Sequence, residues 1–183
     1  MIEKNPKITI ITVVKNGENH IEQNIKSLLN QSYQNYEHII VDGISTDRTL
    51  EIVNKYKYKI HKIISEKDEG LYDAMNKGIK SSSGDIIGIL NSDDYFNKDA
   101  LKIVKTHFEN FPEIDFLFGS VIKHKHLYSF QPWKIYWTFG FYTAHSVGFF
   151  IKRESQLKVG YYNLKYKYSA DYDLFYRMIV KMK

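Results

Sequence analysis

An apolar run that ends in a cluster of carboxylates is the feature of this sequence best suited to chemistry. Residues 86–90 are followed at once by Asn91, Ser92, Asp93 and Asp94. Hard divalent cations prefer oxygen ligands, and Mg²⁺ typically binds through one or two carboxylates together with substrate phosphates. A metal ion held there would neutralise a diphosphate leaving group. The same residue types favour turns and helix N-caps, so a plain turn is the alternative interpretation.

Two further polar groups follow apolar runs. Asp42 comes directly after residues 37–41, where a carboxylate could accept an imide N–H from a pyrimidine base. A turn aspartate beside the flexible Gly43 is the alternative. Residues 66–69 are four successive charged side chains, and Lys67 would add a cation to a nucleotide bound at a helix N-terminus, where anions are attracted. An ordinary solvated loop explains the same charges.

The elements that position these groups follow from the pattern of apolar residues. Short apolar runs alternate with amphipathic segments of about 10–15 residues, which predicts an α/β fold with a mainly parallel sheet and helices on both faces. The expected strands are residues 7–15, 36–41, 60–65, 86–90 and 116–123. The expected helices are residues 20–31, a segment capped by Ser45 or Thr46, and residues 71–80 and 98–111.

In sheets of this kind, ligands bind beyond the carboxyl ends of the strands. The polar groups fall at four such ends, which are marked by Asn16, Asp42, residues 66–68 and residues 91–94. We therefore expect one polar crevice, in which Asp42 and Asp93 emerge side by side.

The regular alternation ends near residue 123. Residues 128–142 are densely aromatic. Aromatic rings stack on sugar faces, so this segment is interpreted as an acceptor platform, a membrane or subunit contact, or packing within the fold. A strand over residues 147–152 and helices over residues 154–159 and from residue 170 onward complete the expected elements. The last helix has no stop signal before the end of the sequence, which indicates truncation at the C-terminus.

Length and composition exclude several classes of protein and of site. The 183 residues suit one domain, and the absence of cysteine excludes disulfides, zinc–thiolate sites and a thiol nucleophile. The start of the sequence does not resemble a signal peptide, and no apolar run approaches the roughly 20 residues of a membrane span. We expect a cytoplasmic protein, with the inner face of the membrane as one location.

The net charge of +5 has several interpretations: a lysine-rich surface, contact with an acidic membrane, or an anionic ligand. The lysines are scattered and no recognition motif for nucleic acid occurs, so nucleic acid is not an expected partner. The sequence also lacks Gly-x-Gly, a P-loop and Gly-x-Ser-x-Gly. These absences disfavour dinucleotide dehydrogenases, P-loop hydrolases and serine esterases.

Four segments, in this order, resemble the GT-A fold glycosyltransferases of family 2. They are residues 13–18 (VVKNGE), 41–47 (VDGISTD), 66–78 (EKDEGLYDAMNKG) and 91–94 (NSDD). The resemblance extends over about residues 7–177. It implies a Rossmann-like, mainly parallel sheet that becomes mixed in its C-terminal part. It also implies a single catalytic domain over residues 1–183, with a nucleotide-binding half (about residues 1–97) and an acceptor-binding half (about residues 98–183).

The resemblance further implies transfer of a sugar from a nucleoside diphosphate carrier, with UDP the expected nucleotide, to an acceptor hydroxyl with inversion. A polysaccharide or a lipid-linked glycan is the expected acceptor. Val14 and Asn16 would line the nucleotide pocket, and Asp42 would hold the base with Asp68 beside it. The alternative is a non-catalytic module that binds a nucleotide sugar or acts as a scaffold. The oligomeric state is not predicted.

The metal and the base are also implied by the resemblance. Asn91, Ser92 and Asp93 match the Asp-x-Asp metal motif, but Asn91 brings no charge and would bind a ribose or sugar hydroxyl instead. Asp93 would then hold Mn²⁺ or Mg²⁺, with His145 as a further contact to the metal or the diphosphate; a structural histidine is the alternative. Asp171 matches the family's general base, although the glutamate that often precedes it is replaced by alanine.

Overall fold

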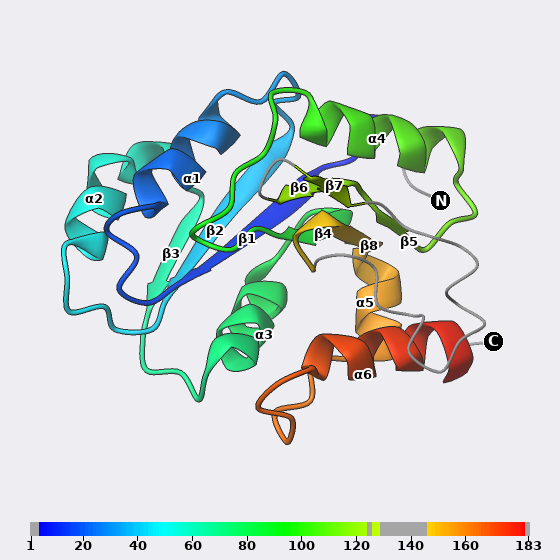
Figure 1. Ribbon diagram of the computed structural model, residues 1–183. Helices are drawn as coiled ribbons and strands as arrows, with labels where there is room; N and C mark the ends of the chain where they lie inside the picture. Colours follow the sequence, from blue (N-terminus) through cyan, green and yellow to red (C-terminus); the bar gives the residue numbers. More distant parts are fainter. Residues whose placement is uncertain (1–3, 124–125, 129–145, 182–183) are drawn as a thin grey trace.

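A six-stranded sheet forms the centre of the protein in this computed structural model, which describes residues 4–123, 126–128 and 146–181 (Figure 1). The strand order is β3-β2-β1-β4-β8-β5. Four strands are parallel to one another: β1 (Ile8–Val14), β2 (Tyr36–Asp42), β3 (Lys62–Ser65) and β4 (Ile86–Ile89). By contrast, β8 (Phe149–Lys152) runs antiparallel to both β4 and β5 (Phe116–Phe118). The predicted mainly parallel sheet with a mixed C-terminal part is confirmed.

Helices cover both faces of the sheet, as predicted (Figure 1). One face carries α1 (Ile21–Leu29), α2 (Thr49–Lys55) and α4 (Ala100–Asn110). The other carries α3 (Leu71–Ser81), α5 (Arg153–Val159) and α6 (Ala170–Tyr176). Short 3₁₀ turns lie at Lys57–Lys59 and Ser146–Gly148, and a π-helical turn follows α6 at Arg177–Lys181. Within the described ranges, no helix has the length and apolar character needed to cross a membrane.

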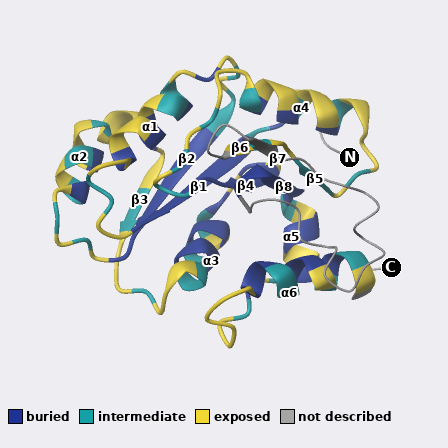
Figure 2. Cartoon of the chain, viewed as in Figure 1, coloured by how far each residue is buried: buried dark blue, intermediate teal, exposed yellow. Residues whose placement is uncertain are grey.

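The central strand β1 shows why the sheet forms the core. All seven of its residues are buried. Ile11 and Val13 pack in the cluster that contains α3 and α6, whereas Ile8 and Ile10 pack in the cluster that contains α1 and α4. A strand covered on both faces is expected to be a nearly continuous apolar run. Figure 2 shows the buried strands between helices whose outer sides are exposed.

The single strand predicted over residues 116–123 is wrong. The chain leaves the sheet after β5, and β6 (Val121–Lys123) pairs with β7 (His126–Tyr128) in a separate antiparallel hairpin. The break lies at Gly119, whose N–H donates to the carbonyl of Gly148 at 2.7 Å. A Cβ on Gly148 would stand 2.6 Å from the Gly119 oxygen, so the two backbones approach too closely for side chains there.

The predicted helix cap at Ser45 or Thr46 is also wrong. Helix α2 begins at Thr49, and Asp47 accepts the Thr49 N–H at 3.0 Å. Ser45 and Thr46 instead contact the loop after β1, through hydrogen bonds with Asn16.

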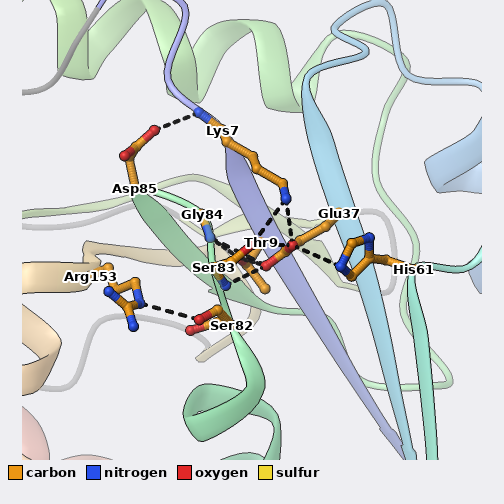
Figure 3. A network of polar contacts seen from close by, with 9 residues as sticks. All are labelled: Lys7, Thr9, Glu37, His61, Ser82, Ser83, Gly84, Asp85 and Arg153. Atoms are coloured by element: carbon orange, nitrogen blue, oxygen red, sulfur yellow. Dashed lines mark hydrogen bonds and ion pairs between the residues drawn. The ribbon is translucent and has the colours of Figure 1, made fainter.

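A buried carboxylate fastens the sheet at the amino ends of its strands (Figure 3). Glu37 is 2% exposed, and Lys7 Nζ lies 2.7 Å from its Oε2. Thr9 Oγ1 donates to Glu37 at 2.6 Å, and the N–H and hydroxyl of Ser83 donate at 2.6 Å each. Burial alone would raise the pKa of Glu37, but these contacts outweigh burial and lower it to about 2. The network joins β1, β2 and the segment before β4.

We expect Glu37 to make the fold sensitive to acid. A carboxyl whose pKa falls from 4.5 in the unfolded chain to about 2 in the folded protein contributes stability above pH 4.5. That contribution is lost as the pH falls toward 2. Between pH 6 and pH 3, the wild type should lose about 2 kcal/mol more unfolding free energy than Glu37→Gln does.

Urea unfolding of both proteins at the two pH values measures this difference. The comparison cancels the acid sensitivity of all other groups, because they are common to both proteins. Equal losses in the two proteins would show that the Glu37 network has no special electrostatic role.

Candidate functional site

The carboxyl ends of β1, β2, β3 and β4 lie at one edge of the sheet, opposite the Glu37 network. All four predicted polar groups follow these ends, so the predicted common edge is present. The expected side-by-side placement of Asp42 and Asp93 is wrong, because β1 lies between β2 and β4. Two strand spacings, about 10 Å, separate the ends of β2 and β4. An extended ligand would have to bridge that distance.

Hydrogen bonds join the loop after β1 to the loop after β2. The Asn16 N–H donates to Ser45 Oγ at 2.8 Å, and the Thr46 N–H donates to Asn16 Oδ1 at 2.8 Å. Three further bonds connect residues 17–18 with residues 47–49. The amide oxygen of Asn16, predicted to line a nucleotide pocket, is therefore used to hold the neighbouring loop. The paired loops form one rigid unit at the edge of the sheet.

Asp42, at the end of β2, and Asp68, in the segment after β3, have different surroundings. Asp42 is fully buried, and its carboxylate accepts the Ser45 N–H at 3.2 Å and the Ser65 hydroxyl at 2.8 Å. Asp68 is partly exposed and lies over Gly43, where a Cβ would overlap its Oδ2. Asp42 thus orients the loop, whereas Asp68 presents a carboxylate at the surface.

The loop after β2 contains a residue with a strained backbone conformation. Ile44 has a φ of 57° and is 52% exposed. A β-branched side chain is strongly disfavoured in this left-handed region. The conformation is imposed by the two hydrogen bonds of Ser45, one to Asp42 and one from Asn16. Strain that the surroundings impose is concentrated at functional sites, so it supports assigning the site to this edge.

The turn after β4 presents the candidate metal ligands. It closes with a hydrogen bond from the Asp94 N–H to the Asn91 carbonyl at 3.0 Å. Asn91 Nδ2 donates to Asp94 Oδ2 at 3.2 Å, which turns Oδ1 of Asn91 inward. Oδ1 is buried and has no hydrogen-bond partner among the described residues. Ser92 lies against the loop after β1, since a Cβ on Gly17 would stand 3.4 Å from Ser92 Oγ.

This donor set fits a hard divalent cation. Asp93 is exposed, and no hydrogen bond or ion pair from the described part of the chain engages its carboxylate. The unused Asn91 Oδ1 lies in the same turn. The described residues contain no cluster of three or more histidine or acidic side chains that would bind a metal alone. One or two carboxylates with an amide oxygen suit Mg²⁺ or Mn²⁺ when substrate phosphates supply further ligands.

Two other predicted contacts have less support from the structure. Lys67 is exposed, and in the described part of the chain its one hydrogen bond is the one that its carbonyl oxygen accepts from Lys77 Nζ at 2.6 Å. Residues 129–145, which include His145 and most of the aromatic segment, lie outside the described residues. The role of His145 therefore remains a prediction.

Asp171 lies where the start of α6 meets the start of α3. It is 8% exposed, and its Oδ1 accepts the Tyr72 hydroxyl at 3.1 Å and the Tyr172 N–H at 2.9 Å. No hydrogen bond from the described residues reaches its Oδ2. The Tyr72 ring stacks on Tyr162, with centroids 5.3 Å apart. Burial, and then the charge of Asp171, raise the pKa of both tyrosines, so both keep their protons at neutral pH.

Tyr72 was not identified from the sequence. Its position three residues after the charged residues 66–69, at the start of a predicted helix, was the available signal. Because α3 follows the carboxyl end of β3, the hydrogen bond from Tyr72 brings Asp171 to the same edge as the paired loops.

A pocket of about 630 Å³ lies at the opposite edge of the sheet and is lined by Tyr36, Glu37, Tyr58 and His61, among others. The buried carboxylate of Glu37 is already engaged by Lys7, Thr9 and Ser83. The carboxylate that lines this pocket is therefore already used within the fold, and we do not assign the site to it.

Comparison with known proteins agrees with this geometry. Residues 9–162 match the family described as "Glycosyl transferase family 2". The sequence is 40% identical over 100 residues to an uncharacterized glycosyltransferase of Haemophilus influenzae. It is 36% identical over 100 residues to the putative teichuronic acid biosynthesis glycosyltransferase TuaG of Bacillus subtilis. Each alignment covers 53% of this chain and 40% of the relative, so the chain spans less than half the length of these proteins.

The fold also matches a solved structure. Residues 1–349 of Staphylococcus aureus TarS, in complex with UDP, superpose with a TM-score of 0.79 and 23% sequence identity. The match covers 94% of this chain and 54% of that chain. At this identity, the likeness establishes the GT-A fold.

We expect Ile44→Gly to stabilise the protein by about 1 kcal/mol, because glycine adopts a positive φ without steric cost. Ile103→Gly is the matched control: Ile103 is 56% exposed but lies within α4, where glycine should lower stability. Urea unfolding of the two variants should give changes of opposite sign. A loss of stability in both variants would contradict strain at position 44.

Proposed function

The chain belongs to glycosyl transferase family 2, and on that premise we propose that it transfers a sugar from a nucleoside diphosphate carrier to an acceptor hydroxyl. The observation that carries the proposal is the common edge at which Asp68 and the turn of residues 91–94 lie. This turn also contains the buried, unpartnered Oδ1 of Asn91. The UDP complex of TarS supports UDP as the nucleotide. The relationship to TuaG supports an acceptor in polysaccharide or lipid-linked glycan synthesis.

The proposed donor lies across the end of β1. Its base contacts the Asp42 and Asp68 side of the edge, with Asp68 supplying the accessible carboxylate. Val14, at the end of β1, and the paired loops, which include Asn16, form the floor. The diphosphate reaches the turn after β4, beside the exposed carboxylate of Asp93 and the amide group of Asn91. In this arrangement the donor spans the distance between the ends of β2 and β4, which is about two strand spacings.

A divalent cation, when bound, would neutralise the charge that develops on the departing diphosphate. Asp93 is the carboxylate proposed to hold it, and Asn91 Oδ1 lies in the same turn. Ser92 lies against Gly17 in this turn.

Asp171 is the proposed general base. Its Oδ2 takes the proton from the acceptor hydroxyl while that oxygen bonds to the anomeric carbon. The bond from the anomeric carbon to the diphosphate breaks on the opposite side, so the configuration inverts and the nucleoside diphosphate leaves. Tyr72 holds Oδ1 and so directs the other oxygen toward the acceptor. A positioned base of this kind typically contributes about 10²–10⁴-fold in rate.

Asp171→Asn should therefore lower turnover by about 10²–10⁴-fold and leave UDP affinity unchanged. Turnover is measured as release of UDP from a UDP-linked sugar, and affinity by calorimetry. Asp173→Asn is the matched control, because Asp173 lies on the same helix and pairs with Arg177 at 2.9 Å. It should keep near-normal turnover. Normal turnover of Asp171→Asn would remove Asp171 from the role of base.

The cation site is tested separately through binding. Asp93→Ala should abolish the increase in UDP affinity that Mn²⁺ produces in the wild type, because the accessible carboxylate of the turn is lost. Glu113→Ala removes the same charge from an exposed residue that precedes β5, and it should bind as the wild type does. Wild-type binding by Asp93→Ala would reject the site. UDP binding by the wild type without transfer to any acceptor would favour a non-catalytic binding module.

A further inference from the structure

A single buried side chain holds both ends of the turn after β4. Asn24, on α1, is fully buried, and its Nδ2 donates to the Asn91 carbonyl at 2.8 Å and to the Asp94 carbonyl at 3.0 Å. Both hydrogens of the amide are therefore used. Its amide oxygen is also engaged, by Thr12, so any effect of Asn24 on the site must act through the turn.

The orientation of Asn24 is fixed by a chain of hydrogen bonds. Because its Nδ2 faces two carbonyls, its Oδ1 faces the Thr12 hydroxyl at 3.1 Å. Thr12 has one proton, which it donates to Asn24, so its oxygen accepts from His38 Nε2 at 2.9 Å. Burial lowers the pKa of His38 to about 3, so the ring is neutral at physiological pH and carries its proton on Nε2. Every hydrogen bond in this series therefore has a defined donor and a defined acceptor.

This series of hydrogen bonds extends from the core to the candidate site. His38 lies in β2 and is 3% exposed, and Thr12 lies in β1 and is fully buried. Asn24 then connects these central strands to the turn of residues 91–94. None of the three residues has a part in the proposed mechanism. Burying a polar group without a hydrogen-bond partner lowers stability. Here each buried polar group bonds to the next, and the last one bonds to the carbonyls of the turn.

We propose that Asn24 is a positioning residue, which fixes the turn of residues 91–94 in the conformation that binds the cation and diphosphate of the donor. This inference rests on the proposed function of the turn. Holding the carbonyls of Asn91 and Asp94 with one amide keeps the turn closed before the ligand binds, so less ordering is required on binding.

Gln31, which lies two residues after the end of α1, provides a matched control. It is 2% exposed, and its Nε2 donates to the carbonyls of Ser27 at 3.0 Å and Asn97 at 2.9 Å. Its Oε1 accepts the Leu101 N–H at 3.1 Å. Gln31 is therefore a buried amide with a similar number of bonds, but it holds the segment after the turn and not the turn itself.

The test compares Asn24→Ala with Gln31→Ala by calorimetric titration with UDP, in the presence and in the absence of Mn²⁺. Asn24→Ala should weaken Mn²⁺-dependent UDP binding by about 10–100-fold, the usual effect of losing a residue that orients metal ligands. Its affinity for UDP without Mn²⁺ should change little, because Asp68 is unaffected. Gln31→Ala should keep both affinities near the wild-type values while losing a similar amount of stability to urea.

Equal Mn²⁺-dependent affinities in Asn24→Ala and Gln31→Ala would overturn the positioning role. A wild type that binds no UDP with Mn²⁺ would instead overturn the proposed function, together with this inference.

A second pair of variants covers the case in which Asn24→Ala does not fold. Thr12→Val keeps the shape of the side chain but removes the hydroxyl that orients Asn24, whereas Thr12→Ser retains the hydroxyl. Thr12→Val should weaken Mn²⁺-dependent UDP binding in the same direction as Asn24→Ala, and Thr12→Ser should restore it. Identical affinities in the two Thr12 variants would contradict the proposal.

Discussion

The hydrogen bonds between the loop after β1 and the loop after β2 are the interactions on which the candidate site depends. Parallel strands buried on both faces deliver their carboxyl ends to one edge, but the loops that follow need partners for their own polar groups. Here the loops satisfy one another, through Asn16 with Ser45 and Thr46, and through residues 17–18 with residues 47–49. This pairing places Ser45 so that it binds the buried Asp42, and it holds Gly17 beside Ser92.

The two ends of the strands differ in what their polar groups do: those at the amino ends stabilise the fold, and those at the carboxyl ends form the candidate site. At the amino ends, Glu37 is buried and engaged by Lys7, Thr9 and Ser83. At the carboxyl ends, Ile44 is held in a disfavoured conformation, and a buried oxygen of Asn91 has no partner among the residues that the structure describes. The usual preferences for backbone conformation and for pairing of buried polar groups are violated where a ligand is proposed to bind. At the opposite edge, the buried Glu37 carboxylate is fully paired. Such a division is common in proteins, because a binding site needs groups that the folded chain leaves unused.

The sequence predicted those parts of the fold that depend on local patterns. Strand and helix positions followed from short apolar runs and amphipathic segments, and the common edge followed from parallel strands. It could not predict the order of the strands, so Asp42 and Asp93 were expected as neighbours although β1 separates them. The hairpin after Gly119 was also missed, because its cause is a close backbone approach to Gly148.

Contacts between distant residues were likewise beyond the reach of local patterns. Tyr72 and Asp171 are 99 positions apart, and Asn24 and Asn91 are 67 apart. One signal was nevertheless present: Asn24 lies on the apolar stripe of α1, between Ile21, Ile25 and Leu28. A polar residue on an apolar helix face usually has a buried partner, as do Thr12 and His38 within their apolar strands.

The most direct test of the account is the broadening of amide NMR signals when Mn²⁺ and UDP are added to isotope-labelled protein, since the paramagnetic ion marks its own position. Signals of Ser92, Asp93 and Gly17 should broaden first, and those of Glu37 and His61 at the opposite edge should stay sharp. Broadening that begins around Glu37, or that is spread evenly over the protein, would contradict a nucleotide and cation site at the carboxyl ends of the strands.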